Sequence, residues 1–560
     1  MRKQVKPTVE AVWKRYDRSV QFNQQIGLYD TVRKNENFFI GRQWEGVEAN
    51  GLPTPVFNFL KRVVLFQVAT ITSDNIAMQA SPLASTSQYD LWDIDQIADV
   101  INKQFQAIFE RNQLVGLLRE YMRNAAVDGD GCLYTYFDPT VENGQAVKGE
   151  IVTEVIENTR VHFGNPNSRA VQSQPYILLS RRMTVEDAKD LAEENGVSEE
   201  DYEAIAPDSE DYRNDADNLT DDKVTVLTYL YKNRETKTVW SYVCTRKVQL
   251  QKPKDTGLTL YPIVWLNWDY IQDNYHGQAM ISGLIPNQIF INKLFAMSMI
   301  SLMTTAYPKI IYDKTRIKGW DSRVGAAIGV VGGGDMNNVA KIMDPAQISP
   351  QIAQFIELAV DYTQSFLGAS DVAMGDTRPD NTSAIVALQR ASNIPMEITK
   401  QNLYRSIEEL GRIYIDHMRN YYGMRYVQIK MKVPEGPQPL GMQLPDLSFE
   451  NQPFDFSVLA EIPVSIQLDV GASSYWSEIA CQQTLDNLLM QGKIELVDYL
   501  ERIPNGYITK KQELIEKLKG MQQAMSSAAG PVLDTNEELP IPTGKGNGAL
   551  QRAINETGVV

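Results

Sequence analysis

The sequence is poor in cysteine and histidine. Its 560 residues contain three cysteines and three histidines, and these lie far apart. Three cysteines cannot build a disulfide framework in so long a chain, and no histidine stands at zinc-ligand spacing from a second histidine or a cysteine. The composition therefore excludes a disulfide-stabilised secreted scaffold and a zinc-cluster protein, and it suits a reducing compartment.

Motifs of nucleotide binding and catalysis are absent as well. The Gly-Lys pairs, Gly492-Lys493 and Gly544-Lys545, are not followed by the Ser or Thr that holds magnesium in a P-loop. The glycine run at 332–334 lacks the spacing of a dinucleotide-binding fingerprint, and neither GxSxG nor HExxH occurs. We therefore expect a chain that is not an enzyme, with no catalytic residues, no cofactor and no metal.

Long hydrophobic runs are also missing. Residues 294–308 carry no charge, but a spanning helix needs about 20 apolar residues. Extending the run toward Asn274 would place Asn287, Gln288 and Asn292 in hydrocarbon. The basic N-terminus is not followed by an apolar stretch of signal-peptide length. We expect neither a signal peptide nor a membrane span. A membrane-associated scaffold remains an alternative, and it would require residues 274–308 to partition into lipid.

Positive charge is outweighed by negative charge. The 54 Lys and Arg against 70 Asp and Glu give a net charge of −16. Binding that wraps or reads nucleic acid through a large basic face is excluded, because it depends on neutralising phosphates. Between Glu186 and Asp222, sixteen acidic residues stand against Lys189 and Arg213. Such a block is typical of a solvated surface or a flexible loop, with electrostatic steering of a partner as the alternative.

The sequence does contain alternating zones of helical and strand patterns. Apolar residues recur every three or four positions over 9–20, 57–68 and 94–109, which predicts helices. From about 130 to 272, runs such as CLYTYF and VTVLTYLY are rich in β-branched and aromatic residues and predict strands. The acidic block interrupts these strands with a short helix expected from Thr184 to Asn195. The pattern predicts a mixed α+β fold.

The most informative pattern lies between residues 283 and 422. A helix is predicted from near Gly283, with Pro286 in its first turn, and a second from Ser349 to Gly368. A compact insert with short strand-like runs separates them. A polar loop then leads into a third helix of about 40 residues, which Pro395 is expected to kink.

The three histidines receive different interpretations. His417 lies on the apolar side of the third helix, which favours a packed or interface histidine. His162 and His276 lie beside turn residues without a recognisable partner, and no role is assigned to them.

Several stretches resemble the portal proteins, or head-to-tail connectors, of tailed double-stranded DNA bacteriophages. Two long helices around a small tip, followed by a polar loop and a kinked longer helix, are similar to the stem, clip, tunnel loop and backbone helix of that family. The resemblance covers about residues 10–500. Its short motifs are NENFFIGRQW at 35–44, PVFNFLKRVV at 55–64, HFGNPNSRAV at 162–171, LYPIVWLNWDY at 260–270, HGQAMISGLIPNQIFIN at 276–292 with Gln288 and Asn292, and MGDTRPDNTSAIVALQ at 374–389.

The resemblance implies a portal fold of the mixed α+β class. Its wing combines helices and strands, its stem has two helices, its clip is a small α/β unit, and a helical crown follows the long helix. The implied boundaries are a wing at 1–282, stem helices at 283–307 and 349–368, a clip at 308–348, a tunnel loop at 369–382, a long kinked helix at 383–422, return strands of the wing at 423–473, crown helices at 474–524 and a flexible tail at 525–560.

The resemblance also implies a function. The chain would form a dodecameric ring at one capsid vertex, a channel through which double-stranded DNA is packaged and later ejected. The implied partners are the major capsid protein, scaffold, the terminase large subunit, and then head-to-tail adaptor or tail proteins, in the virion and in the host cytoplasm during assembly. Another ring-forming virion adaptor and an unrecognised hydrolase remain as alternatives, and a hydrolase would require a carboxylate pair with shifted pKa values in a cleft.

Three groups of residues are expected to make the contacts. A net charge of −2 in the tunnel loop would keep DNA binding weak enough for sliding, and a net charge of +3 from Lys309 to Lys341 would steer acidic partners. The uncharged first stem helix would pack on the second and on neighbouring subunits. The residues are Asp371, Asp376, Arg378, Asp380 and Asn381 for the loop, Lys309, Lys314, Arg316, Lys318 and Arg323 for the clip, and Leu294, Met299, Met303, Phe355 and Ile356 for the stem.

Overall fold

The computed structural model divides the chain into two compact units, Met1–Ser474 and Tyr475–Val560. The described residues are 6–74, 76–82, 91–145, 147–208, 222–306, 310–321, 323, 327–332, 335, 339–342, 354–355, 357–359, 361–362, 396–430, 449–461, 464–470, 485–491, 493–494, 496–502, 514–515 and 517–518.

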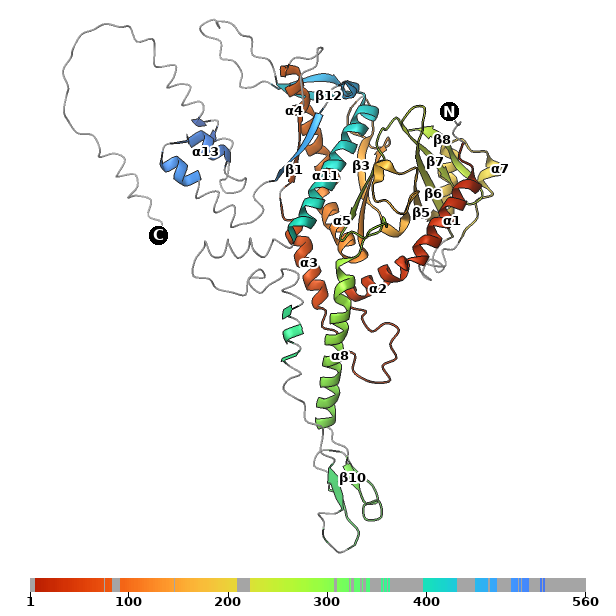
Figure 1. Ribbon diagram of the computed structural model, residues 1–560, viewed down its shortest axis with the longest axis vertical. Helices are drawn as coiled ribbons and strands as arrows, with labels where there is room; N and C mark the ends of the chain where they lie inside the picture. Colours follow the sequence, from red (N-terminus) through yellow and green to blue (C-terminus); the bar gives the residue numbers. More distant parts are fainter. Residues whose placement is uncertain are drawn as a thin grey trace, which may run out of the picture. The chain divides into compact units, whose positions relative to one another are not determined.

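The first unit mixes helices with antiparallel sheets (Figure 1). Apolar stripes at helical spacing and runs of β-branched and aromatic residues form the elements that the sequence predicts. The helices are α1 (Val9–Gln25), α2 (Leu28–Ile40), α3 (Phe59–Ile71), α4 (Leu91–Arg111), α5 (Leu114–Asp128), α6 (Val185–Glu194), α7 (Glu199–Tyr202), α8 (Met280–Ala306) and α11 (Glu397–His417).

The described strands pair only with antiparallel partners. They form a five-stranded sheet in the order β4-β5-β6-β7-β8, a three-stranded sheet β3-β2-β9, and the pairs β1-β14, β10-β11 and β12-β13. The strands are β1 (Ile76–Pro82), β2 (Asp130–Asp138), β3 (Glu150–Val155), β4 (Val161–Phe163), β5 (Ile177–Thr184), β6 (Lys223–Lys232), β7 (Val239–Cys244), β8 (Gln249–Asp255), β9 (Ile263–Asn267), β10 (Ile310–Tyr312), β11 (Ala340–Ile342), β12 (Met424–Lys430), β13 (Phe449–Asp455) and β14 (Val464–Val470). Helices combined with antiparallel strands confirm the expected α+β class.

The largest core lies among α3, α4, α5, α8 and α11 and reaches the three-stranded sheet. Tyr121 of α5 and Tyr414 of α11 are fully buried there, and the hydroxyl of Tyr414 lies 2.8 Å from that of Thr153 on β3. The N-terminal half of α8 packs into this core through Ile281, Leu284 and Ile285. The start of α8 is therefore held by both helices and sheet.

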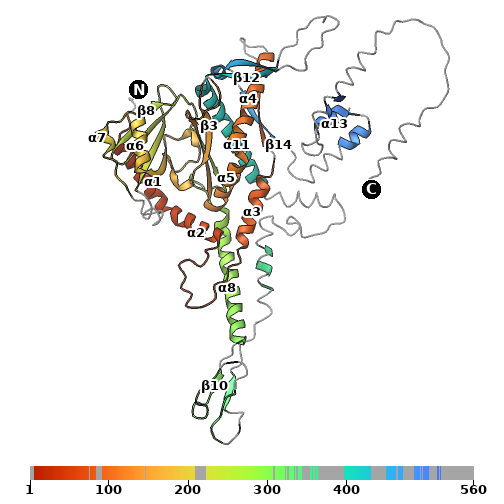
Figure 2. The same ribbon diagram turned by 180° about the vertical axis from the view of Figure 1, so that it is seen from behind.

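The five-stranded sheet is covered on two faces. Trp13 and Tyr16 of α1 pack with Leu227 and Tyr229 of β6. Ala188 and Ala192 of α6 pack with Val224 and Val226 of the same strand. Successive strand residues point to opposite faces, so α1 and α6 cover opposite faces of this sheet (Figure 1 and Figure 2).

Helix α8 differs from its predicted form at the N-terminus. It begins at Met280, so Pro286 lies inside the helix and not in its first turn as predicted. Pro286 cannot donate a backbone hydrogen bond to the preceding turn. Burial of Met280 and Ile281 stabilises that extra turn and offsets the lost bond.

Other predicted elements are present within the limits of the described residues. The helix expected at 184–195 is α6, and the side chain of Thr184 caps it by accepting from the N–H of Asp187. Described residues between 354 and 362 are helical. The third long helix is α11 followed by a π-helical turn, Met418–Tyr422, while Pro395 and its predicted kink lie outside the described residues.

The second unit contains α13 (Leu496–Arg502). Val497 and Leu500 of this helix form a small buried cluster with Ile515. Most residues of the predicted crown and the whole of the predicted tail lie outside the described residues.

Candidate functional site

Asp130 stands at the start of β2 with a fully buried carboxylate. Asn267 Nδ2 and the backbone N–H of Gly277 each donate to its Oδ1 at 2.7 Å. Its Oδ2 lies 2.7 Å from His276 Nδ1 and 3.2 Å from Asn158 Nδ2. Because burying an unpaired carboxylate is costly, these donors are what allow the charge to stay inside. We call Asp130 with these partners the Asp130 hub.

The Asp130 hub also depends on a close approach of two backbones. Gly129 has a φ of +103°, and a side chain there would meet the carbonyl oxygen of Gly277 at 2.8 Å. The N–H of Trp268 donates to the carbonyl of Gly129 at 3.0 Å. Only glycine adopts this conformation without strain and leaves this space. The turn from α5 into β2 is thus held against the loop that leads from β9 to α8.

The stretch 162–171 packs against the same loop. The N–H of Tyr275 donates to the carbonyl of Pro166 at 2.9 Å, and the ring centroids of Phe163 and Tyr275 lie 4.7 Å apart. The guanidinium of Arg169 lies 4.3 Å from the centroid of the Tyr270 ring. The loop from 268 to 277 is therefore held on both sides.

A second polar network crosses the buried side of α8. Asn292 Nδ2 donates to Gln43 Oε1 at 2.6 Å, and Gln288 Nε2 donates to Asn292 Oδ1 at 2.9 Å. Gln288 also donates to the carbonyl of Phe57 at 2.8 Å. Gln43 in turn donates to the carbonyl of Phe38. We call Gln43, Gln288 and Asn292 the amide chain; it joins α8 to the segments around α2 and α3.

Five of the six stretches on which the family resemblance rests meet here. Residues 35–44 and 55–64 contact α8 through the amide chain, and residues 162–171 contact the loop within 260–292. We call the Asp130 hub and the amide chain together the α8 base. Most donors of the α8 base meet an acceptor, while Nε2 of His276 and Oε1 of Gln288 are buried without a hydrogen-bond partner. Hydrogen bonds and packed rings that join distant segments suit mechanical support of α8 better than chemistry.

Sequence reasoning missed the central residue of this site. Asp130 stands between two glycines directly before a strand. This local pattern is the feature of the sequence that could have drawn attention to it. The interpretation of His276 as a histidine without a partner is wrong, because its ring contacts Asp130. His162 also has a neighbour, since its ring lies edge-on to that of Tyr16 at 5.0 Å. Folding brings these partners from distant segments.

His417 is buried, and its Nδ1 lies 2.8 Å from the carbonyl of Ile413. Desolvation lowers its pKa. The packed histidine expected from the sequence is confirmed.

The structure describes some of the residues predicted for the three contact groups and leaves others outside the described residues. The tunnel-loop residues, together with Lys309 and Ile356, lie outside the described residues. Lys314, Lys318 and Arg323 are exposed near the β10-β11 pair, and Arg316 is half-buried. On α8, Leu294 is half-buried while Met299 and Met303 are 41% and 52% exposed, and Phe355 is 58% exposed.

The requirement for a hydrolase is a cleft with a perturbed carboxylate pair. Burial raises the pKa of the carboxyls of Asp128, Asp269 and Glu409, which stand at the end of α5, after β9 and on α11. None of the three lines the hollow of about 190 Å³ beside Glu150. Glu150 itself is neutralised by Arg111 at 2.5 Å and Arg425 at 3.1 Å. This is the pattern of a buried structural ion cluster.

Within the described part of the chain, no group of three or more His, Cys, Asp or Glu could hold a metal ion. Among the helices formed by described residues, none combines the length and apolarity that crossing a bilayer requires.

Comparison with known proteins identifies the family. The model of the phage P22-like portal protein family matches residues 13–437, which is more than half of the chain and includes the whole α8 base. No curated protein matches the chain. The family is structural and not enzymatic, its members are virion components, and it implies capsid assembly as an oligomeric ring. The chain therefore belongs to the phage P22-like portal protein family.

Proposed function

We propose that twelve copies of this chain form a ring at one capsid vertex, with a central channel for double-stranded DNA. DNA enters through the channel during packaging and leaves through it during ejection. Terminase docks on the ring first, and head-to-tail adaptor or tail proteins dock after it. Membership of the portal family supports this proposal, and the surface of α8 is the observation that carries it.

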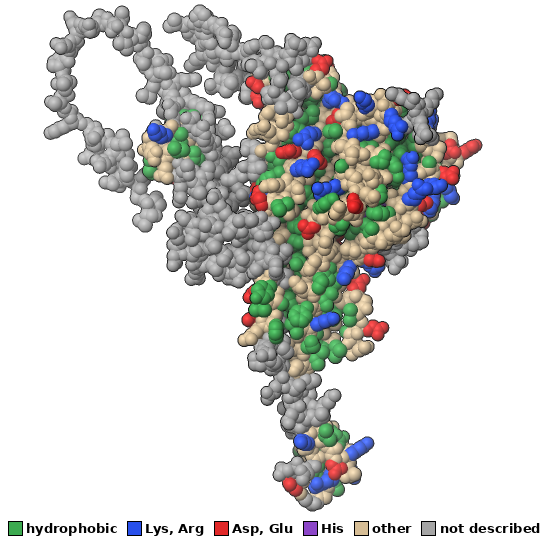
Figure 3. Space-filling model, viewed as in Figure 1, with side chains coloured by type: hydrophobic (Ala, Val, Ile, Leu, Met, Phe, Trp, Pro, Cys, Tyr) green, Lys and Arg blue, Asp and Glu red, His purple; other side chains and the backbone are tan. Residues whose placement is uncertain are grey.

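Helix α8 is too apolar to face water along its whole length. It has 27 residues and a single charged side chain, Lys293. Its exposed large apolar residues continue from one turn to the next, and Figure 3 shows hydrophobic side chains gathered along this helix. Surfaces of this kind mark contacts with other chains. The exposed residues are Phe290, Met297, Met299, Leu302 and Met303.

In this proposal α8 is the first stem helix. Its buried start is anchored at the α8 base, and its exposed half contacts the second stem helix and neighbouring subunits. Phe355, Leu358 and Tyr362 of the second helix are exposed as well. Packing the two apolar surfaces together around a ring would bury both.

The β10-β11 pair belongs to the proposed clip. Lys314, Lys318 and Arg323 are exposed there. Arg323 forms an ion pair with Asp321, with 2.6 Å between Nη2 and Oδ2. A modest basic surface would steer acidic patches of terminase and of the adaptor. The pair has three residues in each strand, so strands from neighbouring subunits are expected to extend it.

The proposed tunnel loop works by binding DNA weakly. Three aspartates and one arginine give residues 369–382 a net negative charge. Each phosphate neutralised in a ring adds affinity through released counterions, so a loop that neutralises few phosphates lets the duplex slide. The energy for movement would come from the terminase, which fits the absence of a P-loop from this chain.

Electron microscopy of the purified protein, with mass from light scattering on the same sample, tests the proposal. The expected result is a ring with a central channel and a mass near twelve times 63.2 kDa. A chain that stays monomeric at high concentration, with and without scaffold, would rule out the ring. The unrecognised hydrolase would then be the leading alternative.

A further inference from the structure

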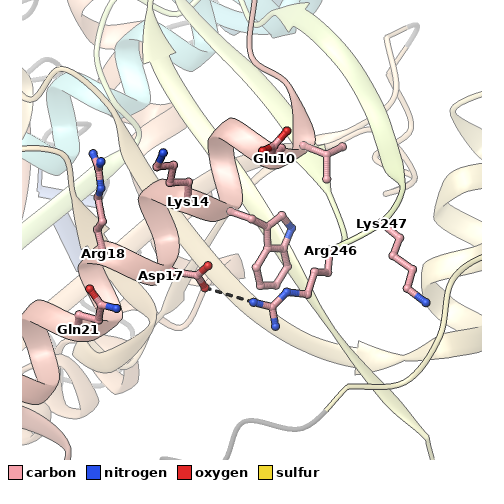
Figure 4. Close-up of a pocket in the computed structure, with 9 residues that line it drawn as sticks. Glu10, Lys14, Asp17, Arg18, Gln21, Arg246 and Lys247 are labelled. Carbon is pink, nitrogen blue, oxygen red and sulfur yellow. Dashed lines mark ion pairs between the residues drawn. The ribbon is translucent and has the colours of Figure 1, made fainter.

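The exposed side of α1 forms a basic hollow with the turn between β7 and β8. Figure 4 shows Lys14 and Arg18 on α1, and Arg246 and Lys247 on that turn. The hollow has a volume of about 640 Å³. Glu10 and Asp17 also line it, so basic side chains outnumber acidic ones by four to two.

Contacts between side chains fix one wall of this hollow in place. Arg246 lies 5.0 Å from the centroid of the Trp13 ring and 3.5 Å from a carboxylate oxygen of Asp17. Trp13 is anchored by its indole N–H, which donates to the carbonyl of Thr245 at 2.7 Å. These contacts hold the turn and the helix together and leave Lys14, Arg18 and Lys247 exposed.

The opposite face of the same sheet is strongly acidic. Helices α6 and α7 expose acidic side chains almost without basic neighbours, and Lys189 is engaged by Glu203 at 3.0 Å. The exposed acidic residues are Glu186, Asp187, Asp190, Glu193, Glu194, Glu199, Glu200, Asp201 and Glu203.

These two surfaces cannot meet within one chain, because the five-stranded sheet lies between them. Residues of α1 pack on Leu227 and Tyr229, whereas residues of α6 pack on Val224 and Val226. A ring that closes by rotation uses two different surfaces of each subunit, one against each neighbour. Complementary charges on opposite faces of one sheet are what such a head-to-tail contact needs.

We infer that the basic hollow on α1 receives the acidic α6–α7 surface of a second copy of this chain. The contact joins neighbouring subunits of the ring, and this inference rests on the proposed function. Its charges steer and orient neighbouring subunits, while the apolar surface of α8 supplies the buried area. Exposed charge pairs are weak one at a time, but a ring repeats the contact at every interface.

Charge reversal on each side, alone and combined, tests the inference. The first variant is Lys14→Glu with Arg18→Glu, and the second is Glu193→Lys with Glu194→Lys. Each is expected to lower the fraction of rings about tenfold at equal protein concentration and low salt, and the combined variant is expected to recover most of it because opposite charges face each other again. Light scattering measures the ring fraction, and thermal unfolding of the monomer checks that each variant folds.

Arg234→Glu with Lys237→Glu is the matched control. It makes the same change of charge at the turn between β6 and β7, at the other end of the sheet, and should leave ring formation unchanged. Rings from all variants in wild-type amounts would overturn the inference and leave the ring itself standing. The inference would also be overturned if each one-sided charge reversal lowered the ring fraction and the combined variant did not recover it. A wild-type chain that forms no ring would instead contradict the proposed function.

Discussion

Asp130 shows what one residue contributes to this molecule. Its carboxylate accepts from Asn158, Asn267, His276 and the backbone of Gly277, so one buried charge ties three segments together. The amide chain does the same for α8 with neutral groups. Buried polar networks of this kind are costly when one member is removed, because the remaining groups lose their partners.

Asn292→Leu should therefore destabilise the fold by about 1–3 kcal/mol, since Gln43 and Gln288 would be left with unpaired buried groups. Chemical denaturation of the purified variant measures this change in the free energy of unfolding. The double variant Gln43→Leu with Asn292→Leu should cost less than the sum of the single changes, because both disrupt the same contact. Additive costs would show that the two side chains do not act together.

Asp128 should make stability depend on pH. Burial, with smaller contributions from Glu36, Glu157 and Asp130, raises the pKa of its carboxyl from 3.8 to about 7. The folded state therefore binds more protons than the unfolded state between these values, and stability falls as the pH rises from about 4 to 7. Asp128→Asn should remove part of that fall, measured as the unfolding midpoint across this pH range. A midpoint whose pH dependence is identical in both proteins would contradict this assignment.

At the scale of elements, α8 combines two environments in one helix. Its start is buried by α2, α3 and α5 and tied by the amide chain, and its later turns expose large apolar side chains. The fold of one chain therefore positions the helix, and the proposed contacts with other chains would cover its exposed turns. In the proposed ring, this division would place the stem helix before the ring closes.

Met299→Glu should block ring formation while leaving the fold of the single chain nearly unchanged. Met299 is 41% exposed, so a carboxylate there stays hydrated in the monomer but would lose water in the packed stem. Ring mass and monomer unfolding measure the two effects separately. Met299→Leu keeps the apolar surface and should form rings as the wild type does; intact rings from Met299→Glu would count against the proposed stem contact.

At the scale of the whole molecule, charge distribution governs the proposed contact with DNA. The chain carries a net charge of −16, which is concentrated around residues 186–222. A strongly acidic ring binds duplex DNA weakly, and weak binding is what a sliding channel requires. Basic residues near β10-β11 and in the hollow on α1 are then available to protein partners.

Replacing Asp371, Asp376 and Asp380 by lysine should tighten DNA binding by the ring and make it fall more steeply with salt. Each added lysine neutralises a phosphate and is repeated in every subunit. DNA affinity at two salt concentrations, with packaging yield alongside, measures the effect. The conservative change to asparagine should alter affinity much less, and equal affinity of the lysine variant and the wild type would show that the loop does not face DNA.

Much of this protein was determined by local sequence pattern. The stripe from Val12 to Val20 forms α1, and runs such as CLYTYF form strands, because the side-chain periods of helices and strands are set by backbone geometry alone. The order of helices around the small insert and the short motifs led to the portal family, which the family comparison confirms.

Only the tertiary structure decided which distant residues meet. Asn267 and His276 meet Asp130, and Gln43 meets Asn292, across more than a hundred residues of sequence. The extra first turn of α8 likewise packs on residues far away in the chain. Local periodicity reports which face of an element is apolar, but it does not report what that face contacts. Buried hydrogen bonds need exact partners in space, so they become visible only when the chain is folded.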